Sequence, residues 1–83
     1  MRLVFLGKLG DVAPPDLSDI ALPGGVQTLA DLKDWIARVQ PPLGRMMAAT
    51  PVRLILNHSV VHDLSAAVGE GDEIAFLPPM SGG

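Results

Sequence analysis

Residues 28–42 read TLADLKDWIARVQPP and form the clearest helix that the sequence predicts. Thr28 is suited to cap the first turn, and Asp31 three residues later completes a capping box, with Asp in place of the usual Glu or Gln. The apolar residues recur at the spacing of one helix face and are Leu32, Trp35, Ile36 and Val39. Pro41 and Pro42 end the helix, because an interior proline lacks the amide hydrogen and collides with the preceding turn. A single helix with one apolar face needs a sheet to cover it.

Segments rich in apolar, β-favouring residues lie on both sides of this helix. Strands are predicted over residues 2–8, 52–57, 58–63 and 73–79, with a shorter one near Leu17–Leu22, and a second short helix is predicted over residues 43–50. The pattern predicts an α+β fold in which a mixed sheet of four to five strands packs on one main helix. We expect the first and last strands to pair in parallel at the centre of the sheet, which is the β-grasp, or ubiquitin-like, architecture.

Length and composition predict one small domain. The chain has 83 residues, and we expect residues 1–77 to form the domain and residues 78–83 a flexible, extended tail. The net charge is −3 and the six basic residues are scattered, which argues against nucleic-acid binding. No segment approaches the roughly 20 apolar residues that cross a bilayer. The absence of cysteine excludes disulfides and thiolate metal sites. These properties predict a protein of the reducing cytoplasm, with no membrane or nucleic-acid partner.

Candidates for an enzyme or metal site are weak. His58 and His62 lie four residues apart, but in a predicted strand or turn, and no further ligand is spaced to join them. Ser59 or Ser65 could pair with a histidine, yet the sequence has no nucleophile elbow or orienting acid at a telling spacing. The acidic residues of 69–73, GEGDE, are typical of a turn rather than of paired catalytic carboxylates. We therefore expect no metal site, no bound cofactor and no catalytic residue in this chain.

The last six residues, 78–83, have the composition of an arm. Pro78 and Pro79 cannot donate hydrogen bonds to a sheet and favour an extended backbone, so they end the last strand and stiffen the exit. Six residues reach roughly 20 Å at about 3.3–3.6 Å each. Gly82 and Gly83 have no Cβ and can enter a channel that is too narrow for side chains. Such an arm delivers the α-carboxylate of Gly83, which is ionised at neutral pH and becomes an acyl donor only after activation, for example by attacking the α-phosphate of ATP.

Residues 68–83, VGEGDEIAFLPPMSGG, resemble the C-terminal signature of the MoaD-like family, the small sulfur-carrier subunits of molybdopterin synthase within the MoaD/ThiS sulfur carriers. That signature has a Gly-Asp-Glu turn, a hydrophobic strand, two prolines, a hydrophobic residue, Ser or Thr, and Gly-Gly. The segments TLADLKDWI and LILN also fit the family, so the resemblance covers essentially the whole chain.

The resemblance implies a β-grasp fold and a defined chemistry. An ATP-dependent activating enzyme adenylates Gly83, and a sulfur donor protein then supplies the sulfur of a thiocarboxylate. The carrier docks on the large subunit of molybdopterin synthase, in an expected heterotetramer. The residues inserted into the partners' active sites are then Pro78, Pro79, Met80, Ser81 and Gly82. The sulfur passes to cyclic pyranopterin monophosphate, in molybdenum cofactor biosynthesis. The carrier itself is non-catalytic, because the catalytic side chains belong to the large subunit.

One stretch departs from the family pattern. Family members commonly carry Ala-x-Leu-Arg-Glu after the first strand, whereas residues 7–11 of this chain read GKLGD. Gly10 stands in place of the Arg, so any partner contact made by that Arg is in doubt here, and Lys8 is the nearest cation in the stretch.

A partner surface is predicted on the sheet. By the alternation of side chains along strands, Leu6 and Leu77 point away from the helix, and Val60 joins them across the sheet. An exposed apolar patch on a small domain suggests an interface, so we predict a partner-binding patch at Leu6, Val60 and Leu77. The alternative is that loops partly cover these side chains.

Other functions remain open at this point. A sulfur carrier for thiamine or cysteine synthesis shares the Gly-Gly end, although thiamine carriers typically lack the Pro-Pro pair. A ubiquitin-like modifier would be conjugated to lysines through Gly83 after the same activation. A plain interaction module would tolerate changes at Gly82 and Gly83.

Overall fold

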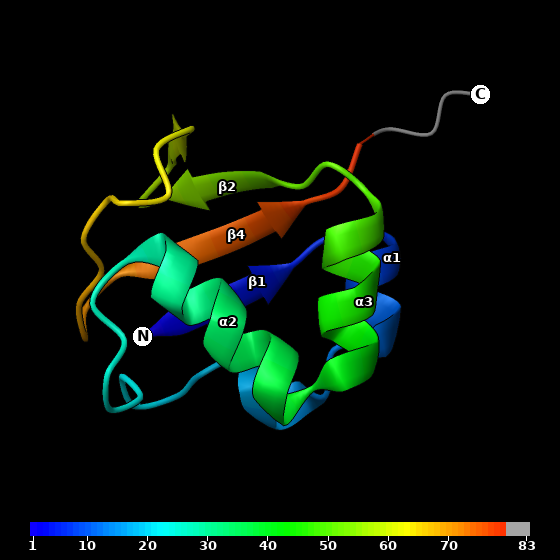
Figure 1. Ribbon diagram of the computed structural model, residues 1–83, viewed down its shortest axis with the longest axis horizontal. Coiled ribbons are helices and arrows are strands. Elements are labelled where there is room, and N and C mark those ends of the chain that lie inside the picture. Colours follow the sequence, from blue (N-terminus) through cyan, green and yellow to red (C-terminus); the bar gives the residue numbers. More distant parts are fainter. Residues whose placement is uncertain (80–83) are drawn as a thin grey trace.

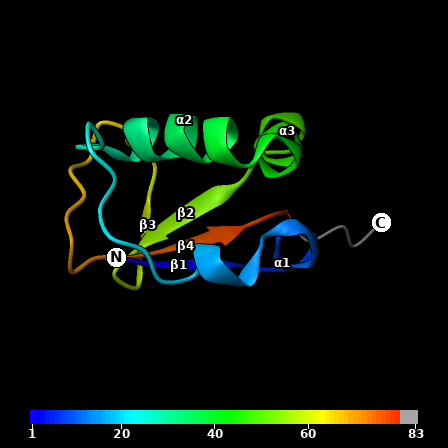
Figure 2. The same ribbon diagram turned by 90° about the horizontal axis from the view of Figure 1, so that it is seen from below.

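The computed structural model describes residues 1–79, so the predictions for Met80, Ser81, Gly82 and Gly83 lie outside the described residues. The strands are β1 (Arg2–Phe5), β2 (Arg53–Leu56), β3 (Ser59–Val61) and β4 (Glu73–Leu77). The helices are α1 (Lys8–Val12), α2 (Leu29–Val39) and α3 (Pro41–Ala49), with a short 3-10 helix, η1, over Pro15–Leu17. Helices α2 and α3 cover one face of the sheet, and α1 lies beside the end of β1 (Figure 1, Figure 2). The predicted α+β class is confirmed.

The sheet is mixed, with the strand order β1-β4-β2-β3. Strands β1 and β4 pair in parallel, with Leu3 beside Ile74 and Phe5 beside Phe76. Strand β2 is antiparallel to both β4 and β3. The predicted parallel pairing of the first and last strands is therefore confirmed, and the fold is a β-grasp. The predicted central position is correct for β4 and wrong for β1, which is an edge strand of this sheet.

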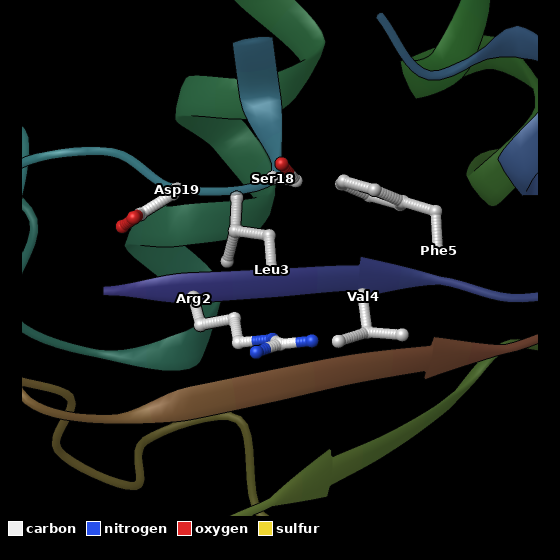
Figure 3. Close-up of a pocket in the computed structure, with 6 residues that line it drawn as sticks. All are labelled: Arg2, Leu3, Val4, Phe5, Ser18 and Asp19. Atoms are coloured by element: carbon white, nitrogen blue, oxygen red, sulfur yellow. The ribbon is translucent and has the colours of Figure 1, made fainter. Parts of the chain in front are cut away.

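A single isolated bridge replaces the strand predicted near Leu17–Leu22, and that prediction is wrong. Arg2 of β1 and Asp19 form the bridge. Leu17 is the last residue of η1 and Ser18 still has a helical backbone, so the chain becomes extended beside β1 only from Asp19. The outer side of β1 therefore borders a surface pocket instead of a full strand (Figure 3).

The side chains of β1 alternate between the two faces of the sheet. Figure 3 shows Leu3 and Phe5 on one side of the strand and Arg2 and Val4 on the other. The first pair belongs to the layer between sheet and helices, where the Phe5 ring stacks on Phe76 with their centroids 4.7 Å apart. The largest fully buried side chains are Leu3, Leu9, Leu29, Leu32, Ile36, Leu43, Ile74 and Phe76.

The first strand is shorter than predicted, because the chain turns into α1. Strand β1 ends at Phe5, whereas the sequence predicted a strand through Lys8. Gly7 has a φ of +57°, a left-handed conformation that glycine adopts without steric cost. Helix α1 follows at once and places Leu9 in the core, with 1% of its surface exposed.

The predicted capping box at the start of α2 is confirmed. The Asp31 N–H donates to Thr28 Oγ1 at 3.2 Å, and the Thr28 N–H donates back to Asp31 Oδ2 at 3.2 Å. The Gln27 N–H donates to the same carboxylate oxygen at 3.0 Å. Hydrogen bonds from the backbones of Gln27 and Thr28 and from the Thr28 side chain lower the pKa of the Asp31 carboxyl below its ordinary value.

Most of the predicted apolar stripe of α2 packs inward. Leu32 and Ile36 are fully buried, and Trp35 is half-buried against the same core. Val39 is 44% exposed, so the stripe ends earlier than predicted. The reason is that α2 ends at Val39 and the chain turns there into α3.

Pro41 and Pro42 end α2 as predicted, and they also begin α3. Both occupy the first turn of α3, where the missing amide hydrogen is not needed. Helix α3 therefore starts two residues before the predicted helix. Gly44 lets α3 approach α2 closely, because a Cβ at Gly44 would lie only 2.7 Å from Cα of Ala37. Among residues 1–79, no helix combines the length and the hydropathy needed to cross a bilayer.

Candidate functional site

The base of the predicted arm rests against the turn between β1 and α1. The Leu6 N–H donates to the Phe76 carbonyl oxygen at 3.0 Å, which holds this turn beside the end of β4. Pro78 is half-buried there, and a Cβ at Gly7 would lie 3.1 Å from its Cγ. Pro79 is exposed. The structure thus shows how the first residue of the arm is held.

Apolar side chains form a row across the sheet face that points away from α2 and α3. In the pairing register the row contains Val4, Ala75, Ile55 and Val60, one residue from each strand. Leu6 and Leu77 lie next to this row, at the end of the sheet where β4 reaches Pro78. We refer to these six residues as the outer-face patch.

The fold brings two of the three predicted patch residues together and leaves the third apart from them. Leu6 follows the Phe5–Phe76 pair, so it lies next to Leu77. Leu6 is 36% exposed and Leu77 is half-buried. Val60 is 51% exposed but sits two strands from β4, with β2 between them. In the pairing register it is connected to the other two through Ile55 on β2 and Ala75 on β4.

Three members of the patch were not among the residues predicted for it, although the alternation along the strands already placed Val4 with Leu6 and Ala75 with Leu77. Val4, Ile55 and Ala75 share a face because strand residues alternate and the register aligns them. The segment LIL contained the signal for Ile55, since its two leucines point into the core. The alignment of Val4, Ile55 and Ala75 across the sheet depends on the strand register, which the sequence does not state.

Charged groups border the outer-face patch. At one end Arg2 Nε lies 3.6 Å from Glu73 Oε1, across the paired strands β1 and β4. At the other end lies the exposed Arg53, the residue of β2 opposite Leu77 in the strand register. The exposed ion pair of Arg2 and Glu73 contributes little to stability. Together with Arg53, these charged side chains form a polar rim around the patch.

The Gly-Asp-Glu turn has a structural role. Asp72 Oδ2 accepts the Gly69 N–H at 2.7 Å, and Asp72 Oδ1 accepts from Asn57 Nδ2 at 2.9 Å. Asn57 Oδ1 in turn accepts the Glu73 N–H at 2.9 Å. These bonds join the turn before β4 to the β2–β3 hairpin and fix where β4 enters the sheet.

The other residues that were considered for catalysis or metal binding also make structural contacts. Glu70 Oε1 lies 3.6 Å from the Met1 ammonium nitrogen, and Glu70 Oε2 accepts the Leu22 N–H at 2.8 Å. The Ser65 hydroxyl donates to Asp63 Oδ1 at 2.6 Å rather than to a histidine. This bond and the Ser65 N–H lower the pKa of the Asp63 carboxyl. Within residues 1–79, no three His, Asp or Glu side chains are grouped to hold a metal ion.

A family model described as the ThiS family matches residues 3–83, nearly the whole chain. The chain belongs to the ThiS family. ThiS-family proteins, the MoaD/ThiS sulfur carriers, are small β-grasp carriers, generally non-catalytic, that work with partner enzymes. No individual curated protein matches the sequence.

In this ThiS-family chain, the packing around Gly10 leaves no room for a side chain at that position. A Cβ at Gly10 would lie 2.7 Å from the Phe5 carbonyl oxygen, a backbone atom that cannot rotate away. Helix α1 is thus packed more closely against the end of β1 than a side chain at this position permits. An Arg here would require α1 to shift, so Gly10 belongs to the local packing of α1 on β1.

Proposed function

We propose that this sulfur carrier is the small subunit of molybdopterin synthase. The observation that carries the proposal is the position of the arm: Pro78 leaves β4 beside Leu6 and Leu77, at one end of the outer-face patch. A partner that binds the patch is then placed to receive the arm. The Pro-Pro pair before Met80 supports the molybdopterin pathway over the thiamine pathway.

The proposed chemistry takes place on the α-carboxylate of Gly83. One carboxylate oxygen attacks the α-phosphorus of ATP in the activating enzyme, the bond to the β-phosphate oxygen breaks, and pyrophosphate leaves. The product is an acyl-adenylate. Hydrosulfide from a sulfur donor protein then attacks the carbonyl carbon, and AMP leaves with the electron pair of the C–O bond. Loss of the sulfur-bound proton leaves a thiocarboxylate.

The thiocarboxylate then delivers its sulfur in the large subunit. The sulfur forms a bond to cyclic pyranopterin monophosphate, water attacks the carbonyl carbon of Gly83, and the C–S bond to Gly83 breaks, which returns the carrier to its carboxylate form. Two such deliveries build the dithiolene of molybdopterin. This chain contributes the arm and the docking surface, and the large subunit contributes the catalytic side chains. Glycine at positions 82 and 83 suits a narrow channel, because neither residue has a Cβ.

The outer-face patch supplies the docking surface in this proposal. Its exposed members, Leu6 and Val60, offer apolar area to a partner, and interfaces of this kind combine an apolar centre with a polar rim. The rim is formed by Arg2, Glu73 and Arg53. Two carriers on a dimer of large subunits give the proposed heterotetramer.

The test is to incubate the protein with MgATP, sulfide and the activating enzyme of the molybdopterin pathway, and to measure its intact mass. We expect a mass increase equal to the replacement of one oxygen by one sulfur. The charged protein, mixed with the large subunit and cyclic pyranopterin monophosphate, is expected to yield molybdopterin. A variant with one alanine added after Gly83 is the control and should remain uncharged.

Other outcomes identify the alternatives. Charging only by the thiamine-pathway activating enzyme would assign the carrier to that pathway. Conjugates to lysines of other proteins, without molybdopterin formation, would assign it as a protein modifier. Molybdopterin formation by the extended variant would refute the role of Gly83.

A further inference from the structure

Gly7 and Pro78 meet at the point where β4 passes into the arm. Gly7 has a φ of +57°, and a Cβ there would lie 3.1 Å from Cγ and 3.8 Å from Cδ of Pro78. Carbon atoms in favourable contact are about 3.5–4.0 Å apart, so the first distance is too short for a side chain without movement. We call this contact the Gly7–Pro78 seat.

We propose that Gly7 is a positioning residue for the arm. Its missing side chain lets Pro78 pack on the β1–α1 turn, and the seat sets the direction in which the chain leaves the sheet. The inference rests on the proposed function, because direction matters only if partner enzymes must charge and unload Gly83.

The seat has the features of a rigid support. The Leu6 N–H bond to the Phe76 carbonyl oxygen, 3.0 Å long, ties the turn to β4 on the residue next to Gly7. The ring of Pro78 restricts its own φ to about −65°. With the ring held against Gly7, few backbone angles remain to vary where the arm begins. Pro79 follows Pro78 directly and is exposed, so the seat fixes where and in which direction the arm leaves the domain.

Catalysis on Gly83 is sensitive to how the arm is presented to the partner enzyme. A misplacement of about 1 Å can lower a reaction rate by about 100-fold even when its cause is remote. Gly7 is not a member of the outer-face patch, so Gly7→Ala leaves the six docking side chains unchanged. A defect in the seat should therefore appear in kcat of the activating enzyme and not in KM for the carrier.

The chain offers a second glycine of positive φ as a control for Gly7. Gly25 also has a left-handed φ, +85°, and nothing lies within 4 Å of the Cβ position. Gly25→Ala therefore introduces the strain of a positive φ without a steric contact. Gly7→Ala introduces both the strain and the contact with Pro78. Pro78→Ala removes the Cγ and Cδ atoms and so removes the seat from the other side.

The experiment compares wild type, Gly7→Ala, Gly25→Ala, Pro78→Ala and the double variant Gly7→Ala/Pro78→Ala. Pyrophosphate release by the activating enzyme is measured with MgATP over a range of carrier concentrations. Circular dichroism fixes a temperature at which every variant is folded. We expect Gly7→Ala to lower kcat on the order of tenfold with KM unchanged, and Pro78→Ala to lower kcat by a similar factor. Gly25→Ala should keep the wild-type kcat, and the double variant should be no slower than the slower single variant.

The possible results of this experiment test the role of the seat and the proposed function separately. Partial unfolding would lower the concentration of active carrier and raise the apparent KM, leaving kcat at saturation unchanged. The seat is overturned if Gly7→Ala has the same kcat as Gly25→Ala, or if the losses of the two single variants multiply in the double variant. Wild-type protein that no activating enzyme can charge overturns the proposed function together with the seat. Wild type that is charged while Gly7→Ala is unaffected overturns the seat alone.

Discussion

Val60→Asp should separate partner binding from folding. Val60 lies on β3 at one end of the apolar row and is 51% exposed. Because exposed positions contribute little to folding, we expect the free energy of unfolding to change by about 0.5 kcal/mol or less. The same residue would become buried when a partner covers the outer-face patch, so the substitution should act mainly on the complex.

The size of the effect follows from the exposed fraction. Burying a whole valine side chain contributes about 1.5–3 kcal/mol, so docking can gain roughly half of this at Val60. Val60→Ala should therefore weaken binding by about 1 kcal/mol, a factor of about five. An aspartate adds the cost of burying an unpaired carboxylate, about 2 kcal/mol or more. The sum predicts that Val60→Asp raises the Kd by about 100-fold or more.

The assay is titration calorimetry of the carrier with the large subunit of molybdopterin synthase. Val39→Asp is the matched control, because Val39 is 44% exposed and lies at the end of α2, in the helix layer. We expect this control to bind like wild type. Equal affinities for Val60→Asp and Val39→Asp, with wild type binding normally, would refute the assignment of the outer-face patch as the docking surface.

Three further predictions concern the scaffold. Gly44→Ala gains about 1 kcal/mol of helix propensity, but its Cβ would lie 2.7 Å from Cα of Ala37, and overpacking costs about 1–3 kcal/mol. At the middle of this range the net loss is about 1 kcal/mol, so we expect Tm to fall by about 4–8 °C, and a higher Tm would mean that α2 and α3 separate easily. His58 has a φ of +73° in the β2–β3 turn, so His58→Gly should raise stability to urea by about 0.5–1 kcal/mol, and a loss would contradict the argument. The pKa of Asp31 is lowered from 3.8 in the folded protein, so its stabilising effect is present above that pH and is lost as the pH falls through the lowered value. The urea midpoint of Asp31→Asn should therefore depend less on pH below about pH 4 than that of wild type, and parallel pH profiles would count against this role.

Local features of the fold were predictable because they depend on neighbours in the sequence. The capping box of Thr28 and Asp31 and the end of α2 before Pro41 each follow from residues within one or two helical turns. The strand predicted near Leu17–Leu22 failed, because Leu17 belongs to η1 and the segment meets β1 in a single bridge at Asp19. The early end of β1 was missed for a related reason, since Gly7 was read as part of a strand and not as a left-handed turn.

The candidate site was predictable only in part. The alternation in the first and last strands placed Leu6 and Leu77 on the same face, and the fold brings them together. Val60 was placed on the correct face, but the residue that connects it to the others, Ile55, was not recognised. The acidic turn was correctly read as a turn, although the bonds that Asp72 makes to the β2–β3 hairpin were not foreseen.

The sequence by itself determined the α+β class, the main helix with its cap, and the signature of residues 68–83 that indicated a sulfur carrier. Each of these is encoded in adjacent residues, where propensity, side-chain alternation and proline act directly. The tertiary structure alone decided the strand order, the apolar row across four strands and the seat of Pro78 on Gly7. These depend on register and on contacts between residues far apart in the chain, and a shift of one residue in register would move every side chain of a strand to the opposite face.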